Sequence, residues 1–247
     1  MKKLLLSAFV ICLAGTSIAQ ESPLWMRHCA LSPDGTTIAF TYKGDIYTVP
    51  STGGRATQIT TNPAFDTEPV WSPDSKQIAF ASDRMGSLDV FVVSSEGGAP
   101  QRLTTHSGSE KPVAYKDNKH ILFTANIAPS AEDAGFPSGQ FQQVYEVAVT
   151  GGRPAMFSSM PMECISINKE GVMLYQDKKG YEDYWRKHQV SPIARDIWTY
   201  TPGKKPVYQK QTTFGGEDRE PVWSPDGKSF YYLSEEKGSF NILQRPA

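Results

Sequence analysis

The sequence predicts an all-β protein built as a β-propeller of four-stranded antiparallel blades. One short phrase, best preserved as Val70-Trp71-Ser72-Pro73-Asp74, recurs five times along the chain. Glycines (20) and prolines (18) punctuate short apolar runs, which favours many strands and tight turns. The first two copies of the phrase start 40 residues apart. Units of about 40–45 residues with four strands each are typical of propeller blades.

The recurring phrase marks the end of the first strand of each unit and the turn that follows it. Its copies are Ala30–Gly35, Val70–Ser75, Val113–Asn118, Ile165–Gly171 and Val222–Gly227. In Ser-Pro-Asp-Gly, proline fixes φ at the second turn position, and aspartate and glycine suit the next two positions. The phrase therefore predicts a type I turn.

The other three strands of a unit follow in order. The apolar run Ile78–Phe80 predicts a buried second strand, and residues 89–93 predict the third. A Gly97-Gly98 turn then leads to a fourth strand that ends near Leu103. The aspartates that open the third strands, Asp45, Asp89 and Asp196, are expected to cap the preceding hairpin by accepting backbone N–H bonds.

The repeated serine is interpreted as a turn residue and not as a nucleophile. A catalytic serine needs a base and an orienting acid in fixed geometry. The chain contains no Gly-X-Ser-X-Gly elbow, and Ser72 and Ser224 are copies of one repeat position. We therefore predict no catalytic residue in this chain.

Blades are predicted to begin near residues 25, 64, 107, 160 and 216, which gives about four and a half blades. The fifth unit has sequence for three strands. Because an open fan would expose apolar faces and strand edges, we expect the remainder of a longer chain to complete a six- or seven-bladed ring. A short terminal strand or another chain, including a homo-oligomer, is the alternative.

The first 19 residues predict a signal peptide. Lys2 and Lys3 precede the apolar stretch 4–14, and Ser17-Ile18-Ala19 supplies small residues at a cleavage site. The mature chain, residues 20–247, is then exported to the periplasm or secreted without a membrane anchor. A lipoprotein at Cys12 is the weaker alternative. Cys29 and Cys164 are expected at the same position of blades one and four, across the propeller axis from each other, and we expect both to be free thiols.

Charge and composition exclude several functional classes. The formal net charge of −1 argues against a nucleic acid as the main partner. The four histidines are scattered, and no His-Glu-X-X-His or Cys-X-X-Cys motif is present. We therefore expect no metal and no cofactor.

The blade motifs resemble those of the TolB propeller, prolyl-oligopeptidase-like peptidases and tricorn-like proteases. The opening Pro23–Arg27 directly before the first blade, and an aromatic–basic stretch before Asp196-Ile197-Trp198, make tricorn-like serine proteases (peptidase family S41 type) the nearest resemblance. It covers essentially the whole mature chain. The resemblance implies an N-terminal propeller that filters substrates or releases products, while the catalytic residues lie in a C-terminal core outside this sequence.

Two sets of residues are candidate sites. The residues placed before each recurring phrase would line the central channel as a charged ring that sorts peptide ends; they are His28, Glu68, Lys111, Glu163 and Glu220. The alternative is that they solvate strand ends. The second set lies in an insertion that favours binding of peptides or partner domains; it comprises Tyr181, Tyr184, Trp185, Arg186, Lys187 and His188. Its alternative is that Tyr184 and Trp185 cap a blade.

Three functions follow from these observations. The first is the non-catalytic propeller of an exported tricorn-like serine peptidase, which contacts peptides, protein partners and the rest of its own chain. The second is a TolB-like periplasmic interaction propeller. The third is the propeller of a prolyl-oligopeptidase-like enzyme.

Overall fold

The computed structural model of the 247-residue chain describes residues 25–127, 141–180 and 190–247. The predicted signal peptide, the loop at 128–140 and the candidate binding residues Tyr181, Tyr184, Trp185, Arg186, Lys187 and His188 lie outside the described residues. No helix long and apolar enough to cross a membrane occurs in the described part.

The described residues form five antiparallel sheets, each connected as a simple meander. Blade 1 contains β1 (Arg27–Leu31), β2 (Thr37–Tyr42), β3 (Asp45–Pro50) and β4 (Thr57–Gln58). Blade 2 contains β5 (Asp66–Trp71), β6 (Gln77–Ser82), β7 (Asp89–Ser94) and β8 (Gln101–Arg102). Blade 3 contains β9 (Lys111–Asp117), β10 (His120–Ala125), β11 (Gln143–Ala148) and β12 (Ala155–Ser158). Blade 4 contains β13 (Met162–Ile167), β14 (Met173–Asp177), β15 (Ile197–Thr201) and β16 (Val207–Lys210). Blade 5 contains β17 (Asp218–Trp223), β18 (Ser229–Ser234) and β19 (Asn241–Pro246).

The all-β propeller prediction is confirmed, and the blade count is corrected from about four and a half to five. The fifth unit forms a separate sheet with the order β17-β18-β19. Its third strand is longer than the predicted Asn241-Ile242-Leu243, because β19 pairs with β18 from Ser234↔Asn241 to Ser229↔Pro246. Blade 5 is therefore a blade in its own right, with three strands instead of four.

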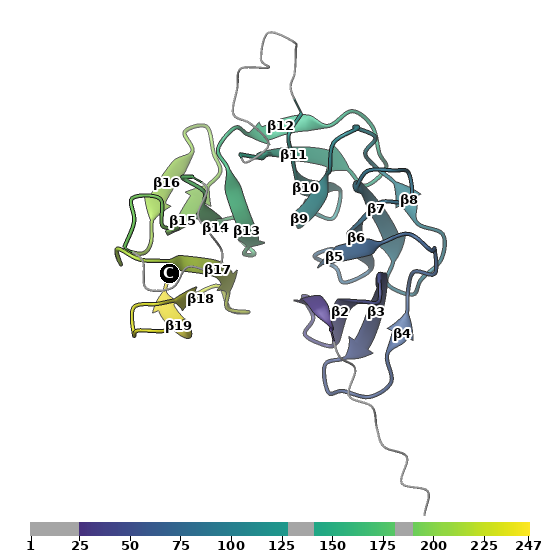
Figure 1. The fold of residues 1–247 in the computed structure, drawn as a ribbon, viewed down its shortest axis with the longest axis horizontal. Helices are drawn as coiled ribbons and strands as arrows, with labels where there is room; N and C mark the ends of the chain where they lie inside the picture. Colours follow the sequence, from purple (N-terminus) through teal and green to yellow (C-terminus); the bar gives the residue numbers. More distant parts are fainter. Residues whose placement is uncertain (1–24, 128–140, 181–189) are drawn as a thin grey trace, which may run out of the picture.

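The five blades follow one another around an arc with a central opening (Figure 1). The first strands of the blades lie innermost, and those of neighbouring blades contact one another. Four buried apolar clusters are present in the described residues, and each is shared by two consecutive blades. In the cluster between blades 2 and 3, for example, Val90 and Val92 pack with Ile121 and Phe123. Apolar burial therefore joins each blade to the next one.

The turns predicted at Ser-Pro-Asp are present. The N–H of Ser75 donates to the carbonyl of Ser72, and the N–H of Gly227 to that of Ser224, each at 2.9 Å. The Ser72 hydroxyl donates to Asp74 Oδ1 at 2.7 Å and accepts the N–H of Gln77 at 2.9 Å. Ser224 makes the same pair of bonds with Asp226 and Ser229. Because each hydroxyl is buried and fully used within its own turn, the repeated serine is a structural residue.

The prediction that Asp45, Asp89 and Asp196 cap the hairpin before the third strand is wrong. The N–H groups of Ile46, Val90 and Ile197 are instead bound by threonine hydroxyls that follow the fourth strands, Thr60, Thr104 and Thr212, at 2.9–3.0 Å. Cationic or polar side chains bind the carboxylates. Asp89 pairs with Arg102 at 2.9 Å, whereas Gln58 donates to Asp45 at 3.0 Å.

Candidate functional site

A left-handed bulge in the first strand places side chains at the central opening. In β1, β5, β13 and β17 the pairing register with the second strand shifts partway along the strand, for example between Thr67 and Val70 of β5. At this shift His28, Glu68, Cys164 and Glu220 have φ between 51° and 54°. Non-glycine residues rarely adopt such φ values, so the same unusual conformation in four blades identifies one structural position.

This position corrects the register of the predicted ring. His28, Glu68 and Glu220 are equivalent, and Cys164 is their counterpart in blade 4. In the strand register, Glu163 lies opposite Gln176 and Lys111 lies opposite Thr124. These are the positions that Thr67, opposite Ala81, occupies in blade 2. Glu163 and Lys111 therefore lie one residue earlier in the strand. The sequence did not reveal this offset because the degraded phrases in blades 3 and 4 lack the Ser-Pro-Asp that anchors the alignment in the other blades.

The same register corrects the comparison of the two cysteines. Cys164 is equivalent to His28 and not to Cys29. Both cysteines are free, as predicted. Cys164 is an exposed residue, but the protein atoms crowded around its thiol and the carboxylates of Glu220 and Glu163 raise the pKa of the thiol to about 12. Cys164 is therefore a poor nucleophile at neutral pH.

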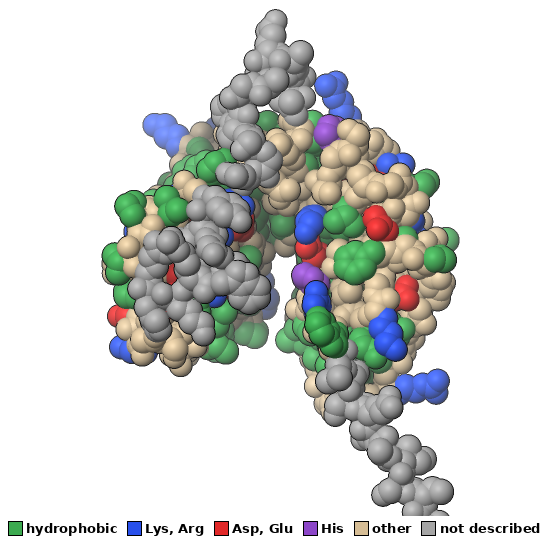
Figure 2. Space-filling model, viewed as in Figure 1, with side chains coloured by type: hydrophobic (Ala, Val, Ile, Leu, Met, Phe, Trp, Pro, Cys, Tyr) green, Lys and Arg blue, Asp and Glu red, His purple; other side chains and the backbone are tan. Residues whose placement is uncertain are grey.

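Charged groups from blades 2 and 3 meet at the opening. Lys111 Nζ on β9 lies 2.8 Å from Glu68 Oε1 on β5. Side chains of both signs gather along the inner edge of this half of the arc, beside a hollow that stays open in the space-filling view (Figure 2). His28 is exposed at the equivalent position of blade 1, and no side-chain contact joins it to the other four candidates among the described residues.

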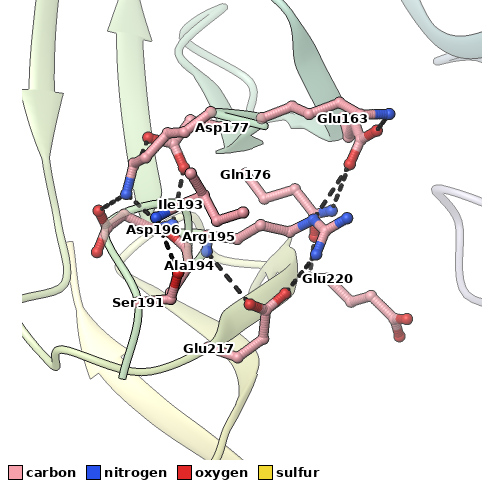
Figure 3. Close-up of polar contacts among 12 residues, drawn as sticks. Glu163, Gln176, Asp177, Ser191, Ile193, Ala194, Arg195, Asp196, Glu217 and Glu220 are labelled. Carbon is pink, nitrogen blue, oxygen red and sulfur yellow. Dashed lines mark hydrogen bonds and ion pairs between the residues drawn. The ribbon is translucent and has the colours of Figure 1, made fainter. Parts of the chain in front are cut away.

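Blades 4 and 5 contribute a second network, centred on Arg195 (Figure 3). Arg195 Nη1 lies 2.6 Å from Glu217 Oε1, and its Nε lies 3.4 Å from Glu163 Oε2. Burial opposes the charge of Arg195, but the hydrogen bond and the charge of Glu217 outweigh it and raise the pKa of the guanidinium group. Arg195 is therefore a permanent cation between Glu163 on β13 of blade 4 and Glu217, which directly precedes β17 of blade 5.

Three side chains bind the carboxylate of Glu163, namely Arg195, Lys178 and Gln176. Lys178 Nζ lies 2.9 Å from Glu163 Oε1, and Gln176 Nε2 donates to Glu163 Oε2 at 3.0 Å. Burial alone would raise the pKa of Glu163, but the bonds from Lys178 and Gln176 lower it below its usual value. Gln176 Oε1 also accepts the N–H of Glu220 at 2.8 Å, which fixes the bulge of β17 against β14.

The Glu220 side chain leaves this network and points away from Arg195 (Figure 3). It is exposed, whereas Glu163 and Glu217 are bound to cations. A cavity of about 240 Å³ lies where β9 and β13 meet, and its wall includes Glu68, Glu163, Cys164 and Lys178. A wall with these side chains suits charged or polar groups. The described residues contain no cluster of three or more His, Cys, Asp or Glu that could hold a metal ion.

Sequence reasoning missed Gln176, Lys178, Arg195 and Glu217. None of them occupies the repeated position, so comparison of the blades gives no signal for them. Gln176 lies in β14, Lys178 directly follows β14, and Arg195 and Glu217 lie just before β15 and β17. The contacts with Glu163 form within blade 4, whereas Gln176–Glu220 and Arg195–Glu217 depend on how blades 4 and 5 pack together.

The fold and the arrangement of inner strands define a β-propeller of the type found in tricorn-like and TolB-like proteins. The family model described as the Tricorn protease N-terminal beta propeller domain matches residues 23–245. The chain belongs to this family.

Comparisons with individual proteins agree with the family match. The chain is 39% identical over 209 residues to Tricorn protease homolog 1 of Streptomyces coelicolor, covering 84% of this chain and 19% of that protein. It is 34% identical over 218 residues to the protein Atu1656 of Agrobacterium fabrum, covering 82% of this chain and 68% of that protein. Over 108 residues (39% of this chain, 16% of the relative) it is 32% identical to peptidase YuxL of Bacillus subtilis. The chain thus spans less than a fifth of YuxL and of the tricorn homologue.

Solved structures show the same fold at low sequence identity. The crystal structure of the tricorn protease matches with a TM-score of 0.70 and 16% identity, over 91% of this chain and 22% of that chain. A putative TolB from Agrobacterium tumefaciens matches with a TM-score of 0.69 and 15% identity, over 91% and 78% of the two chains.

Proposed function

We propose that this chain is the non-catalytic propeller of an exported tricorn-like serine peptidase and that its inner wall filters or channels peptides. The family match over residues 23–245 carries this proposal. The charged groups at the opening supply the means of selection, because a field from fixed charges attracts one class of peptide end and repels the other. Glu68, Lys111, Glu163 and Glu220 contribute these charges, together with Arg195.

The filter is tested in the full-length peptidase that contains this chain. Glu68, Glu163 and Glu220 are replaced together by glutamine, and the kcat/KM values for matched basic and acidic peptides are compared with the wild type. We expect the preference for basic peptides to fall. The control replaces three exposed glutamates elsewhere, Glu96, Glu170 and Glu236, by glutamine. If the ring variant keeps its preference while its circular dichroism is unchanged, the filter is wrong.

A TolB-like interaction propeller is the second candidate function. The structural likeness to the putative TolB and the coverage of 68% of the Agrobacterium fabrum protein favour it. The coding sequence after Ala247 distinguishes the two candidates. A PDZ-like segment followed by a serine peptidase core supports the peptidase, and an early stop supports the interaction propeller.

Export belongs to the proposal in both cases. The basic and apolar residues 1–19 support it, and the TolB-like neighbours suggest a periplasmic protein. N-terminal sequencing of the protein recovered from a periplasmic extract should begin at Gln20. Recovery with Met1 intact from the cytoplasmic fraction alone would contradict export.

A further inference from the structure

Two carboxyl groups face each other inside the junction between blades 2 and 3. Asp89 opens β7, and Glu110 directly precedes β9 of the next blade. Both residues are fully buried, with exposed fractions of 0%. Among the described residues no donor makes a well-aligned hydrogen bond with any of their four carboxyl oxygens, although Arg102 Nη2 lies 2.9 Å from Asp89 Oδ2 as an ion pair. A buried carboxyl group without such bonds is costly if it is ionised.

The preceding junction shows how the same position is satisfied in blade 2. By strand register Glu110 occupies the place of Asp66, since Lys111 and Thr67 are equivalent. Asp66 receives both of its bonds from one arginine, as Arg84 Nη2 lies 2.9 and 3.0 Å from its two oxygens. The equivalent of Arg84 in blade 3 is Ile127, which cannot donate a hydrogen bond from its side chain. Glu110 has therefore lost the counterion that its repeat position provides.

The remaining groups around Glu110 cannot neutralise two negative charges. Arg102 on β8 lies 2.9 Å from Asp89 and balances that carboxylate. The backbone N–H of His106 and the Thr104 hydroxyl also lie near Glu110 and act to lower its pKa, but they only partly offset the effect of burial. The charge of Asp89 adds to the effect of burial, so the pKa of Glu110 is raised. Burial likewise raises the pKa of Asp89, and Arg102 and Glu110 oppose that shift.

We propose that Glu110 and Asp89 form a carboxylic acid–carboxylate pair that holds one proton, which makes the junction between blades 2 and 3 a proton-binding site. Arg102 stabilises the charge on Asp89, and Glu110 carries the proton. Proton binding then strengthens the contact between the two blades. Loss of the proton places a second negative charge in a buried junction with one adjacent arginine.

The direction of the pH effect follows from linkage. The pKa of Glu110 is higher in the folded protein than in the unfolded chain. Its contribution to stability is therefore complete below the unfolded pKa and is lost as the pH rises through the folded pKa. Other carboxyl groups also have shifted pKa values, lowered at Asp34 and Asp74 and raised at Asp218, so the effect is measured as a difference between variants.

The experiment compares urea unfolding of the wild type and Glu110→Gln between about pH 4 and pH 9. Glutamine keeps the shape of the protonated acid and carries no charge. We expect the unfolding equilibrium constant of the wild type, divided by that of the variant, to rise by up to about tenfold per pH unit between the unfolded and the folded pKa of Glu110, and to level off above the folded pKa. Asp66→Asn is the matched control, because Asp66 keeps its arginine partner, with two hydrogen bonds from Arg84. It should lose stability at neutral pH.

Two further measurements keep the proposal falsifiable. Ile127→Arg restores the missing counterion and should flatten the pH dependence. The infrared spectrum of the wild type at neutral pH should contain a protonated carboxyl band that is absent in Glu110→Gln. A wild-type to variant ratio that is independent of pH, or a neutral-pH spectrum without that band, would overturn the proposal.

Discussion

The indole Nε1 of Trp71 donates a hydrogen bond of 2.9 Å to the carbonyl oxygen of Ala30, and this bond joins the first strands of blades 1 and 2. Trp71 also packs into the apolar cluster that these blades share. In blade 5, Trp223 Nε1 donates to the carbonyl of Val172 in blade 4 at 3.2 Å. The tryptophan of the recurring phrase therefore connects each of these blades to its predecessor.

Replacing Trp71 by phenylalanine should destabilise the protein by about 1–3 kcal/mol. The substitution removes the N–H donor and leaves the Ala30 carbonyl without its partner inside a junction. Urea denaturation gives the free energy of unfolding. Trp25→Phe is the control, since Trp25 is 73% exposed and should change stability by less than about 0.5 kcal/mol. Equal losses in the two variants would contradict the role of the bond.

The buried ion pair between Asp66 and Arg84 should be strongly coupled. Asp66 is fully buried, and the Arg84 side chain is 13% exposed and lies over Phe91. Arg84→Met leaves an uncompensated carboxylate and should cost about 3–5 kcal/mol. The double variant Asp66→Leu with Arg84→Met should recover part of that loss, because it removes both charges. A double-mutant cycle without coupling would show that the contact is not energetically important.

The turn serines should matter for stability and not for catalysis. Ser72→Ala removes a hydroxyl that bonds Asp74 and Gln77, and we expect a loss of about 1 kcal/mol in the free energy of unfolding. In the full-length peptidase proposed above, the activity at a temperature well below unfolding should be unchanged. A loss of kcat with normal stability would instead indicate a chemical role for this serine.

Asp74 should contribute to the loss of stability in acid. The Ser72 hydroxyl bonds its carboxylate, and this bond is the largest of the effects that lower the pKa of Asp74. A lowered pKa stabilises the fold above the unfolded pKa of about 3.9, and the benefit is lost as the pH falls through the folded value. Asp74→Asn should therefore show a smaller fall in urea midpoint than the wild type below about pH 4. Parallel curves would contradict this contribution.

Cys164 should react slowly with thiol reagents. Its pKa of about 12 leaves very little thiolate at about pH 8, so alkylation by iodoacetamide should be slow in the folded protein and fast in urea. Mass spectrometry of the labelled peptides measures both rates, and Cys164→Ser identifies the peptide. Rapid labelling of folded Cys164 near neutral pH would be inconsistent with the proposed electrostatic surroundings.

The blade architecture was predictable because the repeat records local chemistry. Ser72, Pro73 and Asp74 form a turn from their own side chains and backbone, so their spacing locates strands without tertiary information. The position of the bulge was not predictable in blades 3 and 4. There Tyr115 and Ile167 are not followed by Ser-Pro-Asp, and the missing landmark shifted Lys111 and Glu163 by one residue.

The contacts of the candidate site depend on distances between blades, which a repeat does not encode. Arg195 reaches Glu163 in its own blade and Glu217 in the next blade because β17 packs against β13 and β15, although these residues have no sequence relation. The aspartates at the third strands show a second limit, which lies inside one blade. The sequence suggested a local cap, whereas Asp89 pairs with Arg102 across the sheet.

The apolar clusters have a consequence for how the number of blades changes in evolution. Each cluster takes one half from one blade and the other half from its successor, so no blade contains a complete core of its own. The smallest cooperative unit is thus a pair of blades, and an excised blade should not fold alone. Gene duplication of one whole repeat adds one complete cluster and leaves the existing clusters intact, whereas an insertion of half a repeat would break two of them.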